Sequence, residues 1–472
     1  MLTAEYLPTG GVRYWTLTPD GADPVVDHQY RPRLYVRADD RHNLDELRAY
    51  LKDHPVVAGV ENCEYRPGWR ADYEPMLRVA VNRRHALTEI AHQVAQYGRP
   101  GGYQCYNVDF SREFRYCLET DHDPTPSRDL DVLRMAAPRE QVAGVTDLTT
   151  VTVGDTTVEG APEVVAADVS ARIRDRDPDV LRVSSADLIP QLFATAPVDD
   201  DVYALGRRPG YTKRAGESTY ESYGQVGHSP ARYSIPGRAI IDESNSFFLE
   251  EAGLDGILDL VARSGKPVQE AAWASIGNLL TAIQIQHAKA NGVVVPWRSW
   301  RTERFKTASQ LDRADRGGFT FEPDVGVHDQ VHELDFSSLY PNIIREHNIS
   351  PETIRCDCHP DREDVPGLGY SICPEDGYLP EVLGPIIDGR ADIKAEVATT
   401  DDPDRAEELE AQSAALKWIL VSCFGYQGFS NAKFGRIEAH EAINAFAREI
   451  LLDAKAAFED AGYRIVHGII DS

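Results

Sequence analysis

The sequence predicts a multidomain protein of mixed α/β and α+β class. At 472 residues the chain is too long for a single hydrophobic core, and three or four domains are expected. Two local patterns predict strands and helices in different regions of the chain. Short runs such as Tyr30–Val36 and Leu77–Val81 are typical of strands, whereas Leu44–Lys52 and Gly253–Gly292 repeat apolar residues at helical spacing.

Two stretches between these runs predict irregular structure. Thr120–Arg128 is rich in Asp and Pro, which is typical of a linker. Tyr211–Tyr233 is rich in Gly, Ser and Tyr, and we expect a loop there. Its aromatic side chains could stack on bases, but packing of the loop on itself is the favoured interpretation.

The charge balance is strongly acidic. The formal net charge is −27, with 49 basic and 76 acidic residues, and such a surplus by itself argues against a nucleic-acid partner. However, only nine of the basic residues are Lys. This composition resembles that of proteins from salt-accumulating halophiles, in which a hydrated acidic surface maintains solubility and salt screens repulsion. Net charge therefore indicates a salt-rich habitat more than it excludes a partner.

Cysteine usage and hydropathy predict a soluble cytoplasmic protein. The seven Cys are an odd number, and the sequence has neither a signal peptide nor an apolar run of membrane-spanning length. We therefore expect free thiols and no membrane contact. A cluster of Cys356, Cys358, His359 and Cys373 is a candidate zinc site, but the C-x-C-H spacing is not a common ligand pairing. Ordinary residues of the surrounding domain are the favoured interpretation.

The most specific stretch is Val331–Arg345, VHELDFSSLYPNIIR. A short alternating apolar run ends in Asp335, a polar turn follows, and an apolar segment resumes at Ile343. An acid at the end of a strand, beside a turn with free N–H groups, can hold a divalent cation and the phosphates that it neutralises. The word D-F-S-S-L-Y-P resembles motif A of family B DNA polymerases.

The resemblance implies a role for each residue of this motif. Asp335 would bind two Mg²⁺ ions, with the carbonyl of Phe336 as a further oxygen ligand. The backbone N–H groups of Ser338, Leu339 and Tyr340 would face the β- and γ-phosphates of a dNTP. The ring of Tyr340 would lie under the sugar and clash with a 2′-hydroxyl, which selects deoxyribose.

The next segment predicts a helical hairpin. Pro380–Val397 places Arg390 and Lys394 on one helical face, and a second helix is expected over about Arg405–Phe424, with Asp404 as its cap. Family B polymerases carry K-x-x-x-N-S-x-Y-G in the corresponding fingers helix.

This chain has KWILVSCFG from Lys417 to Gly425. By the resemblance, Arg390, Lys394 and Lys417 would bind the dNTP triphosphate, whose charge grows on the leaving pyrophosphate. Val421 replaces the family's Asn and Phe424 replaces its Tyr, so affinity or fidelity would differ.

The last segment, Tyr463–Ser472, is YRIVHGIIDS, where the family has a hairpin with Y-G-D-T-D-S. Asp471 matches the family's second Asp, which bridges both metals together with the motif A acid. Ile469 replaces the first Asp, and strand alternation puts it on the same face as Asp471. We expect weaker metal binding and slower catalysis as a result.

Residues 131–300 stand where the family carries a 3′–5′ exonuclease, whose chemistry needs several carboxylates around two metal ions. The first exonuclease motif of the family, D-x-E, has no match. In Val145–Val151, Asp147 is followed by Thr149 at the position where Glu is expected.

The other two exonuclease motifs are also degraded. Asp177–Val180 resembles the flank of N-x-x-x-F-D, but Ser185 stands near the Asn position and no Phe-Asp pair follows. Y-x-x-x-D survives at most as Phe247 to Glu251. We therefore expect an exonuclease fold that is inactive as a nuclease, and an α/β domain unrelated to nucleases remains the alternative.

The resemblance implies the right-hand architecture of family B polymerases with the thumb missing, because the chain stops at motif C. The expected domains are an N-terminal domain (1–130), an inactive exonuclease-like domain (131–300), a first palm segment with motif A (301–380), the fingers hairpin (381–425) and a second palm segment (426–472). A truncated gene, a split polymerase and a degenerate relic all remain explanations of this ending.

The function that the resemblance implies is DNA-templated DNA synthesis by a two-metal mechanism, in an incomplete or weakened form without proofreading. Its partners would be primer–template DNA and dNTPs, with a sliding clamp or a separate polypeptide that supplies the missing palm and thumb. The alternative is a catalytically inactive primer–template binding or accessory protein derived from a polymerase. A free-standing nuclease is least favoured, because the acids that it needs are missing.

Overall fold

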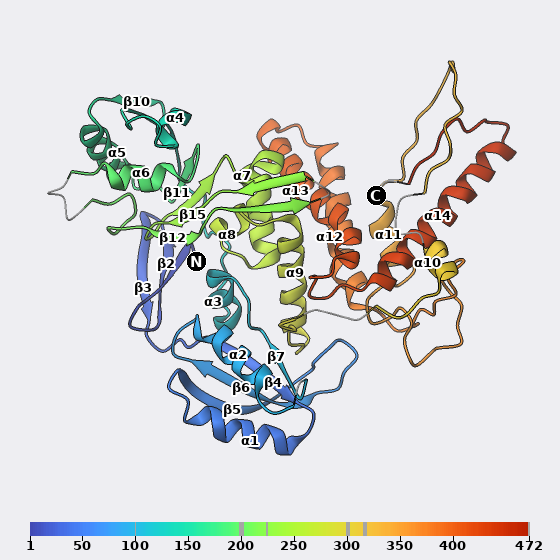
Figure 1. Cartoon of the computed structure of the whole chain (residues 1–472). Helices are drawn as coiled ribbons and strands as arrows, with labels where there is room; N and C mark the ends of the chain where they lie inside the picture. The colour runs from blue at the N-terminus through green and yellow to red at the C-terminus, as the bar shows by residue number, and fades with distance from the viewer. Residues whose placement is uncertain (100, 198–202, 223–224, 299–302, 315–318, 471–472) are drawn as a thin grey trace.

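The computed structural model describes residues 1–99, 101–197, 203–222, 225–298, 303–314 and 319–470. In Figure 1 the chain runs from β-rich structure at the N-terminus (blue), through a mixed sheet (green), to a group of long helices (orange and red). Helices α7 and α9 stand between the green sheet and the orange hairpin of α12 and α13 (Figure 1). None of the helices within the described ranges is long and apolar enough to span a bilayer.

The N-terminal region contains two antiparallel sheets, ordered β1-β2-β3 and β5-β6-β4-β7. Helix α1 is amphipathic, with Leu44, Leu47 and Leu51 buried against the second sheet. Its N-cap is Asp40, whose side chain accepts a hydrogen bond from the N–H of Asn43. The helix predicted near Leu44–Lys52 is thus confirmed. The elements are β1 (Thr3–Tyr6), β2 (Val12–Thr18), β3 (Gly21–Asp27), β4 (Arg33–Ala38), α1 (Arg41–Lys52), β5 (Val57–Tyr65), β6 (Glu74–Val81), α2 (Ala86–Gln96), β7 (Tyr103–Tyr106) and α3 (Arg112–Thr120).

The middle region is built on a five-stranded sheet of order β10-β9-β8-β11-β16. Strands β8, β11 and β16 are parallel, whereas β9 and β10 are antiparallel additions at one edge. Helix α5 covers the sheet with Val165, Val169 and Ile173, which recur at helical spacing and are fully buried. The elements are β8 (Val132–Ala136), α4 (Arg139–Val142), β9 (Thr150–Val153), β10 (Thr156–Glu159), α5 (Pro162–Arg176), β11 (Val180–Val183), α6 (Leu188–Ala194) and β16 (Ala239–Asp242).

The loop predicted over Tyr211–Tyr233 is wrong. Four short strands occupy this stretch: β12 (Thr212–Ala215), β13 (Ser218–Ser222), β14 (Gln225–Ser229) and β15 (Arg232–Ser234). They form two separate antiparallel pairs, β12 with β15 and β13 with β14. The stretch combines Thr and Tyr, which favour extended backbone, with turn residues between them. Composition alone therefore underestimated the strand content.

The largest hydrophobic core lies between helices α7 (Phe247–Ser264), α9 (Ile276–Ala290) and the C-terminal helices. The helix-like pattern over Gly253–Gly292 is confirmed, with α8 (Val268–Ala272) between the two long helices. Helix α7 packs closely on α13 at Gly256, where an added Cβ would lie 2.8 Å from the carbonyl oxygen of Ala411. Glycine is needed there because a side chain would force the two helices apart.

The helices and strands assigned to the C-terminal region, residues 303–314 and 319–470, are all helices. It contains α10 (Ala308–Ala314), α11 (Leu339–Glu346), α12 (Tyr378–Val397), α13 (Pro403–Gly428) and α14 (Ile437–Asp460). The predicted hairpin is confirmed in α12 and α13, but its second helix begins two residues earlier than expected. Asp402 is the N-cap, since its carboxylate accepts hydrogen bonds from the N–H groups of Asp404 and Arg405. The assignment of Asp404 as the cap is therefore wrong.

Candidate functional site

The segment before α11 contains Asp335, the predicted metal-binding acid. The sequence predicts a strand that ends at Asp335, and this prediction is wrong, because residues 331–336 form no strand. Strand backbone needs a neighbour to pair with, and no described residue pairs with this segment. The apolar side chains are therefore solvated, with Val331 60% and Leu334 72% exposed. Asp335 is exposed too, so its carboxylate is accessible to a ligand.

Helix α11 begins directly after this segment. Its N-cap is Ser338, which has a left-handed φ of 53° and does not cap the helix with its side chain. The N–H groups of the first helical turn, which includes Leu339 and Tyr340, have no acceptor within the helix. Helix N-termini stabilise anions through such groups and through the helix dipole. The three predicted phosphate-binding positions thus lie at a helix N-terminus.

Three stacked rings join α11, α13 and α14. The rings of Tyr340 and Phe424 are stacked with centroids 4.3 Å apart and an interplanar angle of 17°. Phe424 stacks in turn on His440, at 4.1 Å and 15°. Tyr340 and Phe424 are both buried. The stack holds the start of α11 against α13. The predicted phosphate-binding amides and the hairpin with the predicted cations therefore pack on each other.

The predicted triphosphate cations lie at different heights along the hairpin. Arg390 Nε donates to the carbonyl of Ser413, 3.2 Å away, and burial lowers the pKa of the Arg390 guanidinium. Lys394 and Lys417 are exposed. Because α12 and α13 are antiparallel, Lys394 lies nearer the hairpin tip than Arg390, and Lys417 lies nearer α11. The levels of the two lysines differ by about eight residues, or about 12 Å of helix.

Lys417, Val421 and Phe424 lie at i, i+4 and i+7 spacing, as a stripe along one face of α13, and the last two differ in burial. Val421 is 55% exposed, one turn beyond Lys417, whereas Phe424 is buried in the ring stack. The stripe therefore runs from solvent into the core. Polar replacements at Val421 would face solvent or a ligand, and those at Phe424 would disturb packing.

The chain end pairs with a segment before motif A. The backbone N–H groups of Phe321 and Asp324 donate to the carbonyls of Gly468 and Val466, at 2.7 and 2.8 Å. Thr320 and Ile469 form an antiparallel bridge. Ile469, which replaces the family acid, is 51% exposed. Asp471 lies outside the described residues.

The acids considered for an exonuclease site do not come together in the middle region. Asp147 lies in the loop before β9, and Ser185 follows β11. Phe247 and Glu251 belong to the first turns of α7, where Glu251 accepts a hydrogen bond from Trp418 Nε1 at 3.2 Å. This contact joins the middle region to α13 and engages the carboxylate.

The pair Asp177 and Asp179 is held in a network of arginines. Arg128 donates to Asp179 at 2.6 Å, and Arg207 donates to both aspartates at 3.0 to 3.1 Å. Arg238 pairs with Asp177 at 2.7 Å. Burial raises the pKa of Asp179, but the hydrogen bonds from Arg128, the Asp131 N–H and Arg207 outweigh it and leave the pKa below its usual value. These two acids stabilise the start of β11 and are not available to a metal.

Sequence reasoning missed the acids Asp242 and Glu243 at the end of β16. Arg134 on β8 and Arg182 on β11 both donate to Glu243, at 2.8 and 2.6 Å. A signal for this pairing was present in the sequence, since β8 and β11 both contain Val-Leu-Arg. The two arginines, Arg134 and Arg182, lie opposite each other in the sheet. Two guanidinium groups neutralise the carboxylate at this edge of the parallel strands. The hydrogen bonds from Arg134 and Arg182 hold the pKa of Glu243 below its usual value, with burial acting in the opposite direction.

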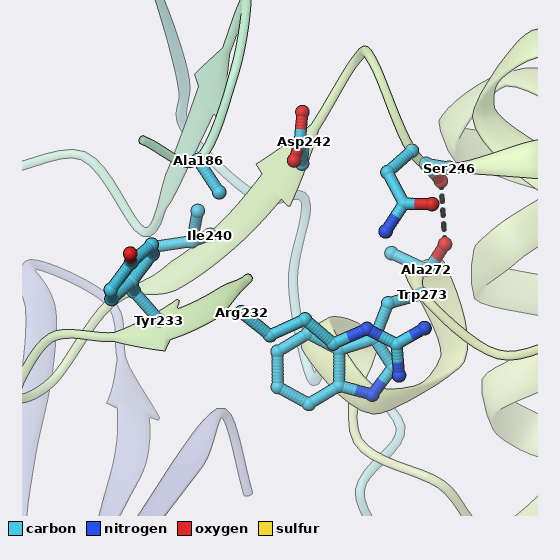
Figure 2. Close-up of a pocket in the computed structure, with 9 residues that line it drawn as sticks. Ala186, Arg232, Tyr233, Ile240, Asp242, Ser246, Ala272 and Trp273 are labelled. Carbon is cyan, nitrogen blue, oxygen red and sulfur yellow. Dashed lines mark hydrogen bonds between the residues drawn. The ribbon is translucent and has the colours of Figure 1, made fainter. Parts of the chain in front are cut away.

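Asp242 lines a small cavity of about 20 Å³ beside these strands. Figure 2 shows Arg232 and Trp273 on the opposite side of the cavity from Ala186 and Ile240. The volume suits one water molecule. Burial raises the pKa of Asp242, although hydrogen bonds from Ser244 act against this effect. A space of this size is too small for a nucleotide.

Comparison with known proteins identifies the C-terminal region. Residues 278–469 match the model of DNA polymerase family B. DNA polymerase 2 of Saccharolobus solfataricus is 36% identical over 219 residues, which cover 46% of this chain and 32% of the relative. DNA polymerase 1 of Pyrococcus abyssi is 27% identical over 239 residues, which cover 50% of this chain and 30% of the relative. The matched segment thus spans about a third of the length of these curated relatives.

The fold is similar beyond the matched sequence. The family B DNA polymerase from the hyperthermophilic archaeon Pyrobaculum calidifontis superposes with a TM-score of 0.76 and 21% identity, covering 99% of this chain and 73% of that one. At this identity the likeness establishes the mixed α/β fold alone. Residues 278–469 are thus similar in sequence to DNA polymerase family B, and the fold of the chain is similar to that of a family B polymerase structure.

Proposed function

We propose that this chain carries out DNA-templated DNA synthesis, transferring a nucleotidyl group from a dNTP to a primer 3′-hydroxyl. The observation that carries the proposal is the packing of Tyr340 on Phe424. This contact joins the N-terminus of α11 to the hairpin with the three cations. Anion-stabilising amides and cations on one rigid unit suit a triphosphate substrate. The family B match of residues 278–469 supports the same function.

The dNTP would be bound from two sides. The N–H groups of Ser338, Leu339 and Tyr340 would receive the β- and γ-phosphates at the helix N-terminus. Arg390, Lys394 and Lys417 would neutralise the charge that develops on the leaving pyrophosphate. The primer 3′-hydroxyl loses its proton to solvent and its oxygen forms a bond to the α-phosphorus, while the bond from that phosphorus to the α,β-bridging oxygen breaks and pyrophosphate leaves. Tyr340 would exclude a 2′-hydroxyl by steric clash.

Asp335, the carbonyl of Phe336 and Asp471 would hold two Mg²⁺ ions. The fit rests on the donor chemistry, since all of these ligands are oxygens, which Mg²⁺ prefers, and the Asp335 side chain is exposed. Bound ions would stabilise the charge of the phosphoryl oxygens. The protein's own contribution is to place Asp335 close in sequence to the α11 amides, because α11 begins four residues later, at Leu339.

We further propose that the activity is weakened and lacks proofreading. Asp177, Asp179 and Glu243 are engaged in arginine pairs and Glu251 accepts a hydrogen bond, which supports the loss of a two-metal nuclease site. Ile469 in place of an acid supports weaker metal binding by the polymerase site. Primer–template DNA would be the main partner, and a sliding clamp or a second polypeptide would be further partners.

The test is primer extension at high KCl with Mg²⁺, on the chain and on its variants. Asp335→Ala should lower extension at least about 100-fold, because it removes a carboxylate that would hold the metal ions. Glu333→Ala is the matched control, an exposed acid two residues away.

Unchanged extension by Asp335→Ala would contradict the proposal. Failure of every version to extend a primer, with DNA binding intact and indifferent to Mg²⁺, would favour the inactive binding protein instead.

A further inference from the structure

The loop between α11 and α12 gathers three thiols and an imidazole. The ligand atoms of Cys356, Cys358, His359 and Cys373 all lie within 4.8 Å of one another. The Sγ atoms of Cys358 and Cys373 are 3.7 Å apart. His359 Nδ1 is 3.1, 3.7 and 3.9 Å from the Sγ atoms of Cys358, Cys356 and Cys373. The sequence favoured ordinary residues here, and the structure brings all four to one point.

Backbone pairing brings the two ends of this loop together. Ile354 and Ile372 form an antiparallel bridge, the Arg355 N–H donates to the Ser371 carbonyl at 2.7 Å, and the Cys373 N–H donates to the Thr353 carbonyl at 2.9 Å. Cys356 therefore directly follows one strand of this ribbon, and Cys373 lies in the other strand, opposite Thr353. The cluster is formed by a defined fold and not by a chance approach of long side chains.

We propose that Cys356, Cys358, His359 and Cys373 bind one structural Zn²⁺ ion. Tetrahedral zinc with Zn–S bonds of about 2.3 Å requires sulfur atoms about 3.8 Å apart, and sulfur to nitrogen distances of about 3.6 Å. The Sγ separation of 3.7 Å and two of the three Nδ1 distances agree with this geometry. The third, from Nδ1 to Cys358 Sγ, would lengthen by about 0.5 Å, and Cys358 is the most exposed of the four residues.

The donor set selects zinc among the common metals. Three thiolates and one imidazole exclude Mg²⁺ and Ca²⁺, which take oxygen ligands. An iron–sulfur cluster needs more room than four ligand atoms within 4.8 Å leave between them. Four protein ligands close the coordination shell, which is typical of structural and not of catalytic zinc.

The ion would stabilise a loop that has little core of its own. Between Cys356 and Cys373 only Val365, Tyr370 and Ile372 are among the large buried apolar side chains, and Tyr370 donates to Glu441 of α14 at 2.9 Å. Zinc would fix the base of the loop, where its two ends are paired. The proposal does not depend on the proposed polymerase activity, and its test needs none.

The test is metal analysis of the purified full chain, kept reduced and free of chelators after expression with zinc. We expect about one zinc per chain. Cys358→Ser and His359→Ala should each weaken zinc binding at least about 10-fold, since even residues around a zinc ligand contribute that much. Cys63→Ser on β5 and His42→Gln on α1 are the matched controls, because both residues lie outside the cluster.

Two further measurements keep the test decisive. Circular dichroism establishes that each variant is folded, and Co²⁺ substitution should give the visible absorption of a tetrahedral cobalt–thiolate site that Cys358→Ser loses. A folded, reduced chain without zinc would overturn the proposal. Undiminished zinc in folded Cys358→Ser and His359→Ala would overturn it as well, and so would a Cys358–Cys373 disulfide in place of bound metal.

Discussion

The middle sheet and the C-terminal helices use the same charged residue types for different purposes. In the sheet, Asp177, Asp179 and Glu243 pair with arginines from neighbouring strands and loops. In the C-terminal region, Asp335, Lys394 and Lys417 are exposed. Charges that are paired within the fold stabilise it, whereas exposed charges around a helix N-terminus remain available to a ligand.

The energetics of the two arrangements differ as well. A buried charge is costly unless it is paired, so the removal of one partner leaves the other uncompensated. An exposed charge is already solvated, and its removal changes stability little. Mutations in the two regions should therefore separate cleanly into effects on folding and effects on activity.

The largest effect is expected at Asp179, which is 1% exposed and bonded to Arg128 and Arg207. Asp179→Ala should destabilise the protein by about 3–5 kcal/mol, because it leaves the Arg128 guanidinium without its carboxylate and Arg207 with Asp177 alone. Urea denaturation at constant KCl measures this loss. Asp168→Ala, which removes an exposed acid paired with Arg172 on α5, should cost less than about 1 kcal/mol. Equal losses of unfolding free energy in the two variants would contradict the distinction between buried, paired charges and exposed charges.

A second effect concerns pH and the buried acid Glu113. Burial raises the pKa of Glu113 to about 8, and the nearby Arg214 only partly offsets this. Between about pH 5 and 8 the folded chain therefore binds more protons than the unfolded chain, so the free energy of unfolding falls as pH rises, by up to about 1.4 kcal/mol per unit. Glu113→Gln should flatten this section of the curve, and Glu89→Gln on α2 should not. A curve that keeps its slope in Glu113→Gln would assign the pH dependence to other groups.

The next effect is on activity alone. Lys417→Ala should raise the KM for dNTP and lower kcat/KM about 10- to 100-fold, because a cation at the triphosphate is lost. The midpoint of unfolding should not move, since Lys417 is exposed. Steady-state primer extension measures the change, with Lys52→Ala at the end of α1 as the control. A loss of stability that matches the loss of activity would remove Lys417 from the site.

The sequence predicted the helices and the order of motifs better than it predicted the strands. Helices α1, α12 and α13 follow from apolar spacing within one segment. The strand expected at Val331–Asp335 is absent, because a strand also needs a neighbour, which no local pattern can supply. The stack of Tyr340, Phe424 and His440 was missed for the same reason, as it joins three helices far apart in sequence. Asp471, the second predicted metal acid, remains untested.

The smallest effect of a mutation is expected at Val421, which tests whether the face of α13 next to Lys417 also contacts the nucleotide. Val421 is 55% exposed and lies one turn from Lys417, at a position where family B polymerases carry Asn. Val421→Asn should leave the free energy of unfolding within about 0.5 kcal/mol, because Val and Asn have similar helix propensities and the side chain is not in the core.

The same change would restore a hydrogen-bonding group near the nucleotide. One such bond is worth about 0.5–1.5 kcal/mol, so the KM for dNTP should fall about 2- to 10-fold. Val164→Asn, at an exposed position on α5, is the matched control and should leave KM unchanged. If Val421→Asn leaves KM unchanged as well, then this face of α13 does not contact the nucleotide, and the weakening that we propose must be traced to Ile469 instead.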